Sequence, residues 1–335
     1  MSKVNLIEIA LMLFLTGCAP AASPIQLPAS TVIAENPPAC AGAKMVYHSQ
    51  LREMLLIGCA QDSDREDHPN IIWAWNGARW HKITEGGPLM RVLGSAAYDQ
   101  KRNVLVLYGG QSLKTGQCVR ETWEWDGQVW VRKEAESPPV CDHFEMVYDE
   151  SRAEVVLFGG QDKSQNPNNE TWSWNGATWT SISNTGPESR AHFGFEYDPT
   201  HEQILLYGGY TGSVLDDFWA WKNNAWQEIN FPGPGALSHF GMTIDANTNA
   251  LIIFGGATSS STFSSLSDKT WILTGGAWSE LNLENSPSKR GSPAMDYDPE
   301  RKKTVLYGGF DSNGDALNDI WEWDGKQWSC VVNCQ

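Results

Sequence analysis

The side chains best suited to chemistry in this sequence stand just before six short apolar segments, each of which ends in a turn. Counted back seven residues from the Tyr or Ile of each segment, the sequence reads Cys40, Arg91, Cys141, Arg190, Leu237 and Arg290. Counted back five residues, it reads Gly42, Leu93, His143, His192, His239 and Ser292. Guanidiniums pair with carboxylates and phosphates, and imidazoles transfer protons or bind metals, so these positions are the first candidates for a site.

A metal site at these positions would require the histidine nitrogens to converge on one point. The three histidines belong to consecutive repeats, which favours a fan along one arc, so we expect no metal and no cofactor. Two catalytic motifs, Gly-x-Ser-x-Gly and His-Glu-x-x-His, are absent from the sequence. The segment Asp311–Asp315 resembles a calcium loop only faintly, because its glycine is misplaced and no glutamate closes it.

The elements that must position these residues repeat six times along the chain. One phrase reads MLLIGC, LVLYGG, VVLFGG, ILLYGG, LIIFGG and TVLYGG, and its copies begin 47 to 53 residues apart. Each copy is preceded by the apolar segment described above and followed by a tryptophan-rich hairpin such as WSWNGATW. Each unit therefore predicts four short strands and no helix, and a period near 50 residues is typical of an all-β, six-bladed β-propeller with four antiparallel strands per blade.

The hairpin phrase also predicts where the tryptophans lie. We expect a two-residue turn at Asn175-Gly176, which pairs Trp174 with Ala177 and Trp172 with Trp179. All three rings then share one face of the sheet, and a neighbouring blade is expected to cover that face. A platform of exposed rings for sugars is disfavoured, because six such platforms would expose too much apolar surface.

These phrases together resemble the kelch repeat, including the central domain of galactose oxidase. The resemblance rests on Arg190-Ala-His192, on the Leu-Tyr/Phe-Gly-Gly strand and on an acidic residue two before a tryptophan, and it covers about residues 40 to 330. That acidic residue is Glu121, Glu170, Asp217 or Asp319. No residue matches the copper site of galactose oxidase with its cross-linked Tyr and Cys, so its activity is not carried over.

In kelch propellers, ligands commonly bind at one mouth of the central channel and at the loops around it. The resemblance makes six residues candidates for ligand binding: Arg91, His143, Arg190, His192, His239 and Arg290. The alternative is that these side chains belong to the repeat itself and only satisfy backbone carbonyls.

The N-terminus resembles a bacterial lipoprotein signal, residues 1–18, in which an apolar run ends in Leu15-Thr16-Gly17-Cys18. The resemblance implies lipidation at Cys18, and an ordinary cleaved signal peptide is the alternative. Residues 19–39, rich in Pro, Ala and Ser, are expected to form a tether before a propeller at 40–335. Ala19 resembles the outer-membrane sorting pattern of Gram-negative bacteria; otherwise we expect the cell membrane, reached only through the lipid.

The other six cysteines predict disulfides in an oxidising compartment. We expect a Cys118–Cys141 bridge between a loop of blade 2 and the linker into blade 3. The candidates for the seam of the ring are Cys40, Cys59, Cys330 and Cys334. We expect a bridge across the seam, such as Cys40–Cys334, or else two local bridges, Cys40–Cys59 and Cys330–Cys334.

The formal charge of −16 excludes nucleic acid as a partner, because nothing would neutralise the phosphates. The leading hypothesis is a monomeric, non-enzymatic, lipid-anchored propeller that binds a protein or glycan partner. The alternative is an enzyme acting on a carbohydrate or peptide at the channel mouth, like the sugar mutarotases among bacterial kelch propellers, with His143, His192 or a mouth arginine as its acid or base.

Overall fold

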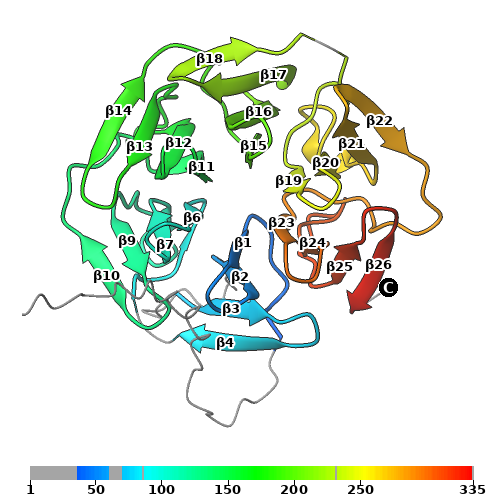
Figure 1. Cartoon of the computed structure of the whole chain (residues 1–335), viewed down its shortest axis with the longest axis horizontal. Helices are drawn as coiled ribbons and strands as arrows, with labels where there is room; N and C mark the ends of the chain where they lie inside the picture. Colours follow the sequence, from blue (N-terminus) through cyan, green and yellow to red (C-terminus); the bar gives the residue numbers. More distant parts are fainter. Residues whose placement is uncertain (1–35, 60–69, 85–86, 231, 334–335) are drawn as a thin grey trace, which may run out of the picture.

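The computed structural model describes residues 36–59, 70–84, 87–230 and 232–333. Six antiparallel sheets of four strands are arranged as a ring around a central channel (Figure 1). The all-β six-bladed propeller expected from the repeats is therefore confirmed. The signal segment, Cys18, most of the tether and Cys334 lie outside the described residues. Within the described part of the chain, no helix has the length and apolar character to cross a membrane.

The strands of each blade run in sequence order from the channel outwards (Figure 1). Blade 1 contains β1 (Lys44–His48), β2 (Glu53–Ile57), β3 (Ile72–Trp75) and β4 (Trp80–Thr84). Blade 2 contains β6 (Ser95–Asp99), β7 (Val104–Tyr108), β9 (Thr122–Trp125) and β10 (Trp130–Lys133). Blade 3 contains β11 (Asp142–Asp149), β12 (Glu154–Gln161), β13 (Thr171–Trp174) and β14 (Trp179–Ser183). Blade 4 contains β15 (Gly194–Asp198), β16 (Gln203–Tyr210), β17 (Val214–Lys222) and β18 (Ala225–Glu228). Blade 5 contains β19 (Gly241–Asp245), β20 (Ala250–Phe254), β21 (Thr270–Thr274) and β22 (Ala277–Leu281). Blade 6 contains β23 (Ala294–Asp298), β24 (Lys303–Tyr307), β25 (Ile320–Trp323) and β26 (Trp328–Val332). A two-stranded sheet of β5 (Arg91–Val92) and β8 (Gln111–Ser112) extends blade 2.

The predicted register of the tryptophan hairpin is wrong by two residues. Trp174 pairs with Trp179 and Trp172 with Ser181, so four residues, Asn175 to Thr178, form the turn. The Asn175 Oδ1 accepts hydrogen bonds from the backbone N–H groups of Ala177 and Thr178, which closes this longer turn. A shift of two residues preserves the alternation of side chains, so the three rings still share one face.

The tryptophans fill the spaces between blades, as predicted. Trp174 and Trp179 pack against Val106 and Tyr108 of blade 2 in one buried cluster. The Trp174 indole N–H donates to Glu124 Oε1 at 2.8 Å, and the Trp179 N–H donates to Thr122 Oγ1 at 2.8 Å, both across the blade boundary. Apolar burial and these hydrogen bonds together fix each blade against its neighbour.

Among the strands that the structure describes, none is exchanged between the two end blades that meet at the seam. Blade 1 is built from β1 to β4 and blade 6 from β23 to β26. The Cys40 N–H donates to the Leu317 carbonyl at 3.0 Å, and the Gly309 N–H donates to the Cys40 carbonyl at 2.9 Å. The Tyr307 hydroxyl, at 3.0 Å from the carbonyl oxygen of Pro37, also holds the last residues of the expected tether against blade 6.

The disulfide prediction at the seam is wrong, because Cys40 is bonded to Cys59 within blade 1. Neither cysteine is therefore available for a bridge to blade 6, and the ring closes there through hydrogen bonds and packing. The local alternative is confirmed for Cys40–Cys59; Cys330 is also disulfide-bonded.

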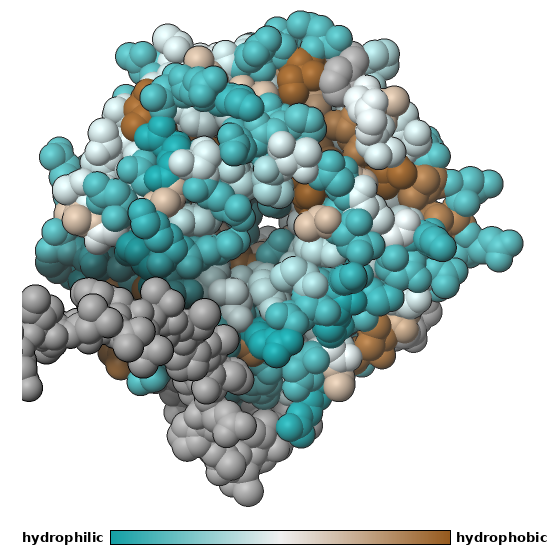
Figure 2. Space-filling view, viewed as in Figure 1, coloured by the Kyte–Doolittle hydropathy of each residue, from teal (hydrophilic) through white to brown (hydrophobic). Residues whose placement is uncertain are grey.

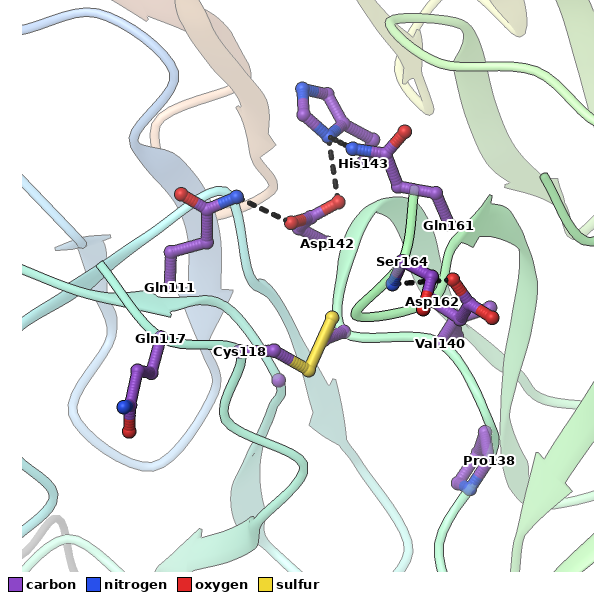
Figure 3. Close-up of a disulfide and its surroundings, with 12 residues drawn as sticks. Gln111, Gln117, Cys118, Pro138, Val140, Asp142, His143, Gln161, Asp162 and Ser164 are labelled. Carbon is purple, nitrogen blue, oxygen red and sulfur yellow. Dashed lines mark hydrogen bonds and ion pairs between the residues drawn. A yellow bond between two sulfur atoms is a disulfide. The ribbon is translucent and has the colours of Figure 1, made fainter. Parts of the chain in front are cut away.

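The predicted Cys118–Cys141 bridge is confirmed. It joins the loop that follows β7 to the segment that enters β11, as Figure 3 shows. A bridge that closes a loop of this length contributes roughly 3 kcal/mol on the chain-entropy model. Disulfides persist in oxidising compartments, which indicates an extracytoplasmic setting.

Candidate functional site

One ring of backbone with unusual geometry encircles a mouth of the channel. The six residues five positions before the Tyr or Ile all have positive φ: Gly42 (70°), Leu93 (61°), His143 (59°), His192 (54°), His239 (58°) and Ser292 (48°). Four neighbouring pairs are joined by backbone hydrogen bonds; His239 N–H donates to the His192 carbonyl at 3.0 Å, for example, and Ser292 N–H to the His239 carbonyl at 2.6 Å. A left-handed conformation costs a residue with a side chain about 1 kcal/mol, and these hydrogen bonds between blades maintain it.

This backbone brings the three candidate histidines together as a continuous arc. The ring centroids of His192 and His239 are 3.7 Å apart with nearly parallel planes, and those of His143 and His192 are 4.9 Å apart at 89°. All three line a cavity of about 100 Å³ at the mouth. Because His192 and His239 stack and His143 meets His192 edge-on, the three rings form a row. The described residues include no group of three or more His, Cys, Asp or Glu arranged to hold a metal.

Two imidazoles of the arc, those of His192 and His239, are held neutral by their surroundings. Burial lowers the pKa of His239 to about 4, with a further contribution from the charge of His143. Burial also lowers the pKa of His192 far below its ordinary value, and the charges of His239 and His143 add to this effect. At neutral pH these two rings therefore offer one N–H donor and one acceptor nitrogen each, rather than a positive charge.

The lowered pKa of His239 predicts a loss of stability in acid. Below about pH 6.5 the unfolded chain binds a proton at this histidine that the folded protein resists, so stability falls as the pH is lowered from about 6.5 towards 4. We expect His239→Asn, which tolerates the left-handed backbone, to remove about 1–2 kcal/mol of the stability difference between pH 7 and pH 5. Urea unfolding of parent and variant at both pH values measures this difference. His201→Asn, whose imidazole is 64% exposed, is the control, and an undiminished acid loss in His239→Asn would contradict the assignment.

A polar cluster, Gln111, Asp142 and Gln161, occupies the end of the arc next to His143. Asp142 Oδ1 lies 2.8 Å from His143 Nδ1, and Asp142 Oδ2 accepts a hydrogen bond from Gln111 Nε2 at 2.7 Å. Figure 3 shows the His143 ring directed away from the disulfide, with Asp142 and Gln161 beside its Nδ1. Burial acts to raise the pKa of Asp142, but the hydrogen bonds from His143 and Gln111 outweigh it and lower the pKa below its ordinary value.

Sequence reasoning missed this cluster, although a signal was present. Asp142 stands between Cys141 and His143, one residue before the left-handed position. Gln111 and Gln161 each directly follow a Gly-Gly pair. In the structure Gln111 contacts Asp142 at the start of the next blade, and Gln161 pairs with Asp142 at the start of its own blade. The residue after Gly-Gly could therefore have been added to the candidates.

The three candidate arginines lie inside the blades and not on the arc. Each is buried and binds the acidic residue of its own repeat and the carbonyl of the first glycine of the Gly-Gly pair; the acidic partners of Arg91, Arg190 and Arg290 are Glu121, Asp217 and Asp319. In Arg290 the two contacts to Asp319 are both 2.7 Å and parallel, the strongest geometry for this pair. The structure therefore places the arginines where they satisfy backbone carbonyls, while the histidines face the mouth.

The central channel behind the mouth is a larger cavity of about 460 Å³, lined by the innermost strands of all six blades. Figure 2 shows the hollow at the centre of one face. Lys44 and Glu145 form an ion pair of 2.5 Å where this cavity meets the smaller one.

Two further acids from different blades, Glu196 and Asp296, line the channel. Burial raises the pKa of Asp296 to about 6, against the hydrogen bonds that it accepts from the N–H groups of Tyr297 and Tyr47. Burial, and then the charge of Asp296, raise the pKa of Glu196 well above its ordinary value. The channel thus carries carboxyl groups that hold protons more tightly than free ones. These two acids were not among the predicted candidates. Their signal in the sequence was an acid at a repeat position that is apolar in blades 1 to 3, where it is Val46, Ala97 and Val147.

Comparison with known proteins agrees with this architecture. The pattern that defines the KLHDC2/KLHL20/DRC7 Kelch-repeats domain matches residues 42–256. This chain belongs to the kelch-repeat family. Kelch propellers typically serve as protein-interaction modules, and this kelch chain has their six-bladed form.

A solved structure described as "Structure of YjhT" resembles this kelch chain with a TM-score of 0.68 at 12% sequence identity, over 88% of this chain and 98% of that one. At this identity the likeness shows the fold alone. No curated protein sequence matches the chain significantly.

Proposed function

We propose that this kelch propeller is a lipid-anchored, extracytoplasmic interaction module that binds a protein or glycan partner at the face carrying the histidine arc. The observation that carries the proposal is the arc itself. Three imidazoles from three blades lie side by side around an open cavity, on backbone that costs free energy to maintain. The repeat would permit less strained residues there, so the arrangement supports a role beyond folding.

Two features of the chain, its disulfides and its N-terminal sequence, support the proposed location. The disulfides Cys40–Cys59 and Cys118–Cys141 suit an oxidising compartment. The Leu15-Thr16-Gly17-Cys18 sequence supports a lipid at Cys18, and residues 19–36 would give the propeller reach from the membrane. In a Gram-negative cell, Ala19 favours the outer membrane.

Site-specific photo-crosslinking in cells tests the proposed face. The loops between β12 and β13 lie on the arc side of the ring, whereas the turns between the first and second strands lie on the other side, because a strand reverses direction at each turn. We expect p-benzoylphenylalanine in place of Lys163, an exposed residue of the β12–β13 loop, to yield a partner adduct. The same photoprobe in place of Lys101, exposed in the β6–β7 turn, is the matched control. Adducts from position 101 alone would move the interface to the opposite face.

One observation favours a second candidate, an enzyme acting on a carbohydrate or peptide at the same mouth. The Asp142 carboxylate lies within hydrogen-bond distance of His143 Nδ1, as in a carboxylate-oriented general base. This candidate predicts turnover of a sugar or peptide by the parent protein that His143→Asn abolishes. Absence of turnover by the parent across panels of both substrate classes would exclude it.

A further inference from the structure

The histidine arc continues into two phenylalanines, which makes a row of five aromatic rings along the mouth. The Phe310 ring centroid lies 6.0 Å from that of His239, and the Phe263 centroid lies 5.4 Å from that of Phe310. The row therefore runs Phe263, Phe310, His239, His192 and His143, across blades 5, 6, 5, 4 and 3.

The backbone beneath the row is shaped for these rings. A Cβ added to Gly291 would lie 2.3 Å from the Phe310 ring, so a side chain at this position would displace Phe310. Phe263 belongs to a short 3-10 helix, Thr262–Ser265, in the loop between β20 and β21, and its side chain is among the most exposed large apolar groups described, at 52%. An exposed phenylalanine at one end of an ordered aromatic row is a surface that a ligand would cover.

The row changes character from one end to the other. The Phe263 end is apolar, His239 and His192 in the middle offer neutral donors and acceptors, and the far end adds the His143 ring and the amides of Gln111 and Gln161, beside the buried Asp142. A site of apolar and aromatic surface with a few placed polar groups fits a ligand that has both kinds of surface.

Charge decides which class of ligand fits this row. The protein carries a formal charge of −16, and the arginines nearest the mouth, Arg91, Arg190 and Arg290, are buried in ion pairs with acids of their own blades. Lys44, at the base of the mouth, is paired with Glu145. A ligand rich in carboxylates or phosphates would find these cations already engaged, whereas an uncharged ligand meets no such penalty.

From this geometry we infer that the row from Phe263 to His143 binds a neutral oligosaccharide. A pyranose ring has an apolar face of C–H groups, which are attracted to the negative face of an aromatic ring, and a rim of hydroxyls that pair with imidazoles, amides and carboxylates. Successive sugar units would then lie along the row with Phe263 under one end and His143 and Gln161 at the other. The inference rests on the proposed function, since it names the partner class of the same face.

Calorimetric titration of the full chain carrying Cys18→Ser tests the inference, with uncharged hexasaccharides of glucose, xylose and N-acetylglucosamine as probes and hexagalacturonate as the charged comparison. We expect saturable binding of at least one neutral probe, and a loss of affinity of tenfold or more in Phe263→Ala and in His192→Asn. Val131→Ala, an exposed apolar residue of β10, and His201→Asn are the matched controls and should bind like the parent.

The other outcomes overturn the inference in distinguishable ways. Tighter binding of hexagalacturonate than of any neutral probe would contradict the neutral class. Neutral binding that Phe263→Ala and His192→Asn leave unchanged would place the sugar elsewhere. If no probe binds while position 163 still forms a protein adduct, the glycan inference fails and the proposed interaction face stands. If position 163 forms no adduct either, both fail.

Discussion

Arg290→Ala is expected to lower the free energy of unfolding by about 3–5 kcal/mol. The Arg290 guanidinium is fully buried, makes two parallel contacts of 2.7 Å to Asp319 and donates to the Gly308 carbonyl at 3.0 Å. Its removal leaves a carboxylate without its cation and a carbonyl without its donor, and an unpaired buried charge is costly. Chemical denaturation of the parent and the variant measures the difference.

A surface arginine provides the control for this prediction. Arg132 is half exposed and lies 3.5 Å or more from its acidic neighbours, so Arg132→Ala should cost between about 0 and 1 kcal/mol. Arg290→Lys keeps the charge but loses the paired geometry, and we expect it to fall between the two. A cost below about 1 kcal/mol for Arg290→Ala would show that the guanidinium is not the structural element described above.

Trp174→Ala is expected to destabilise the propeller by about 3–5 kcal/mol. The indole is fully buried between blades 2 and 3, and its N–H donates to Glu124 Oε1 at 2.8 Å. The substitution leaves a cavity at the blade boundary and removes a donor from a buried carboxylate. Trp174→Phe keeps an aromatic ring and loses the N–H with only part of the indole volume, so we expect a smaller cost of about 1–3 kcal/mol. Thermal and urea unfolding provide the measurements.

The outer surface of a blade supplies the comparison for Trp174. Val131 in β10 is 52% exposed, and Val131→Ala should change stability by less than about 0.5 kcal/mol. If Trp174→Ala cost no more than Val131→Ala, the tryptophans would not be what holds neighbouring blades together.

The fold could be predicted from the sequence because its determinants repeat. Six copies of strand and turn phrases define six blades, and the face of the tryptophans depends only on whether a shift in register is even or odd. That is why the two-residue error at Trp174 and Trp179 did not alter their location. The turn itself could not be predicted, since Asn175 closes a four-residue loop through its own side chain rather than a two-residue turn.

The site was predictable only where it follows the repeat. His143, His192 and His239 share one repeat position, so their convergence at one mouth followed from the ring. Phe263 lies in a loop where the copies differ, and nothing in its spacing showed that it would extend the arc. Asp142 and its amide partners stand at strand ends, where the residue after Gly-Gly was the one signal. Arg190 precedes His192 by two residues and yet is buried in the blade. The chain changes direction at His192 itself, which has a left-handed backbone conformation.

The seam could not be settled from cysteine counting. Cys40 and Cys334 are close to the two ends of the repeat series, but Cys59 stands where other blades have the second glycine, directly beside the start of its own blade. Cys40 therefore pairs with Cys59, which is close to it within blade 1. The hydrogen bonds of Cys40 to Leu317 and Gly309 take over the closure that a bridge was expected to provide.

The central claim is that the histidine arc recognises the partner while the arginines maintain the fold. The yield of the adduct at position 163 in a His192→Asn background tests this claim most directly. The claim predicts that His192→Asn keeps the Tm of the parent within a few degrees and loses the adduct, whereas Arg190→Ala lowers the Tm. A His192→Asn protein that stays folded and forms the adduct in full would contradict it.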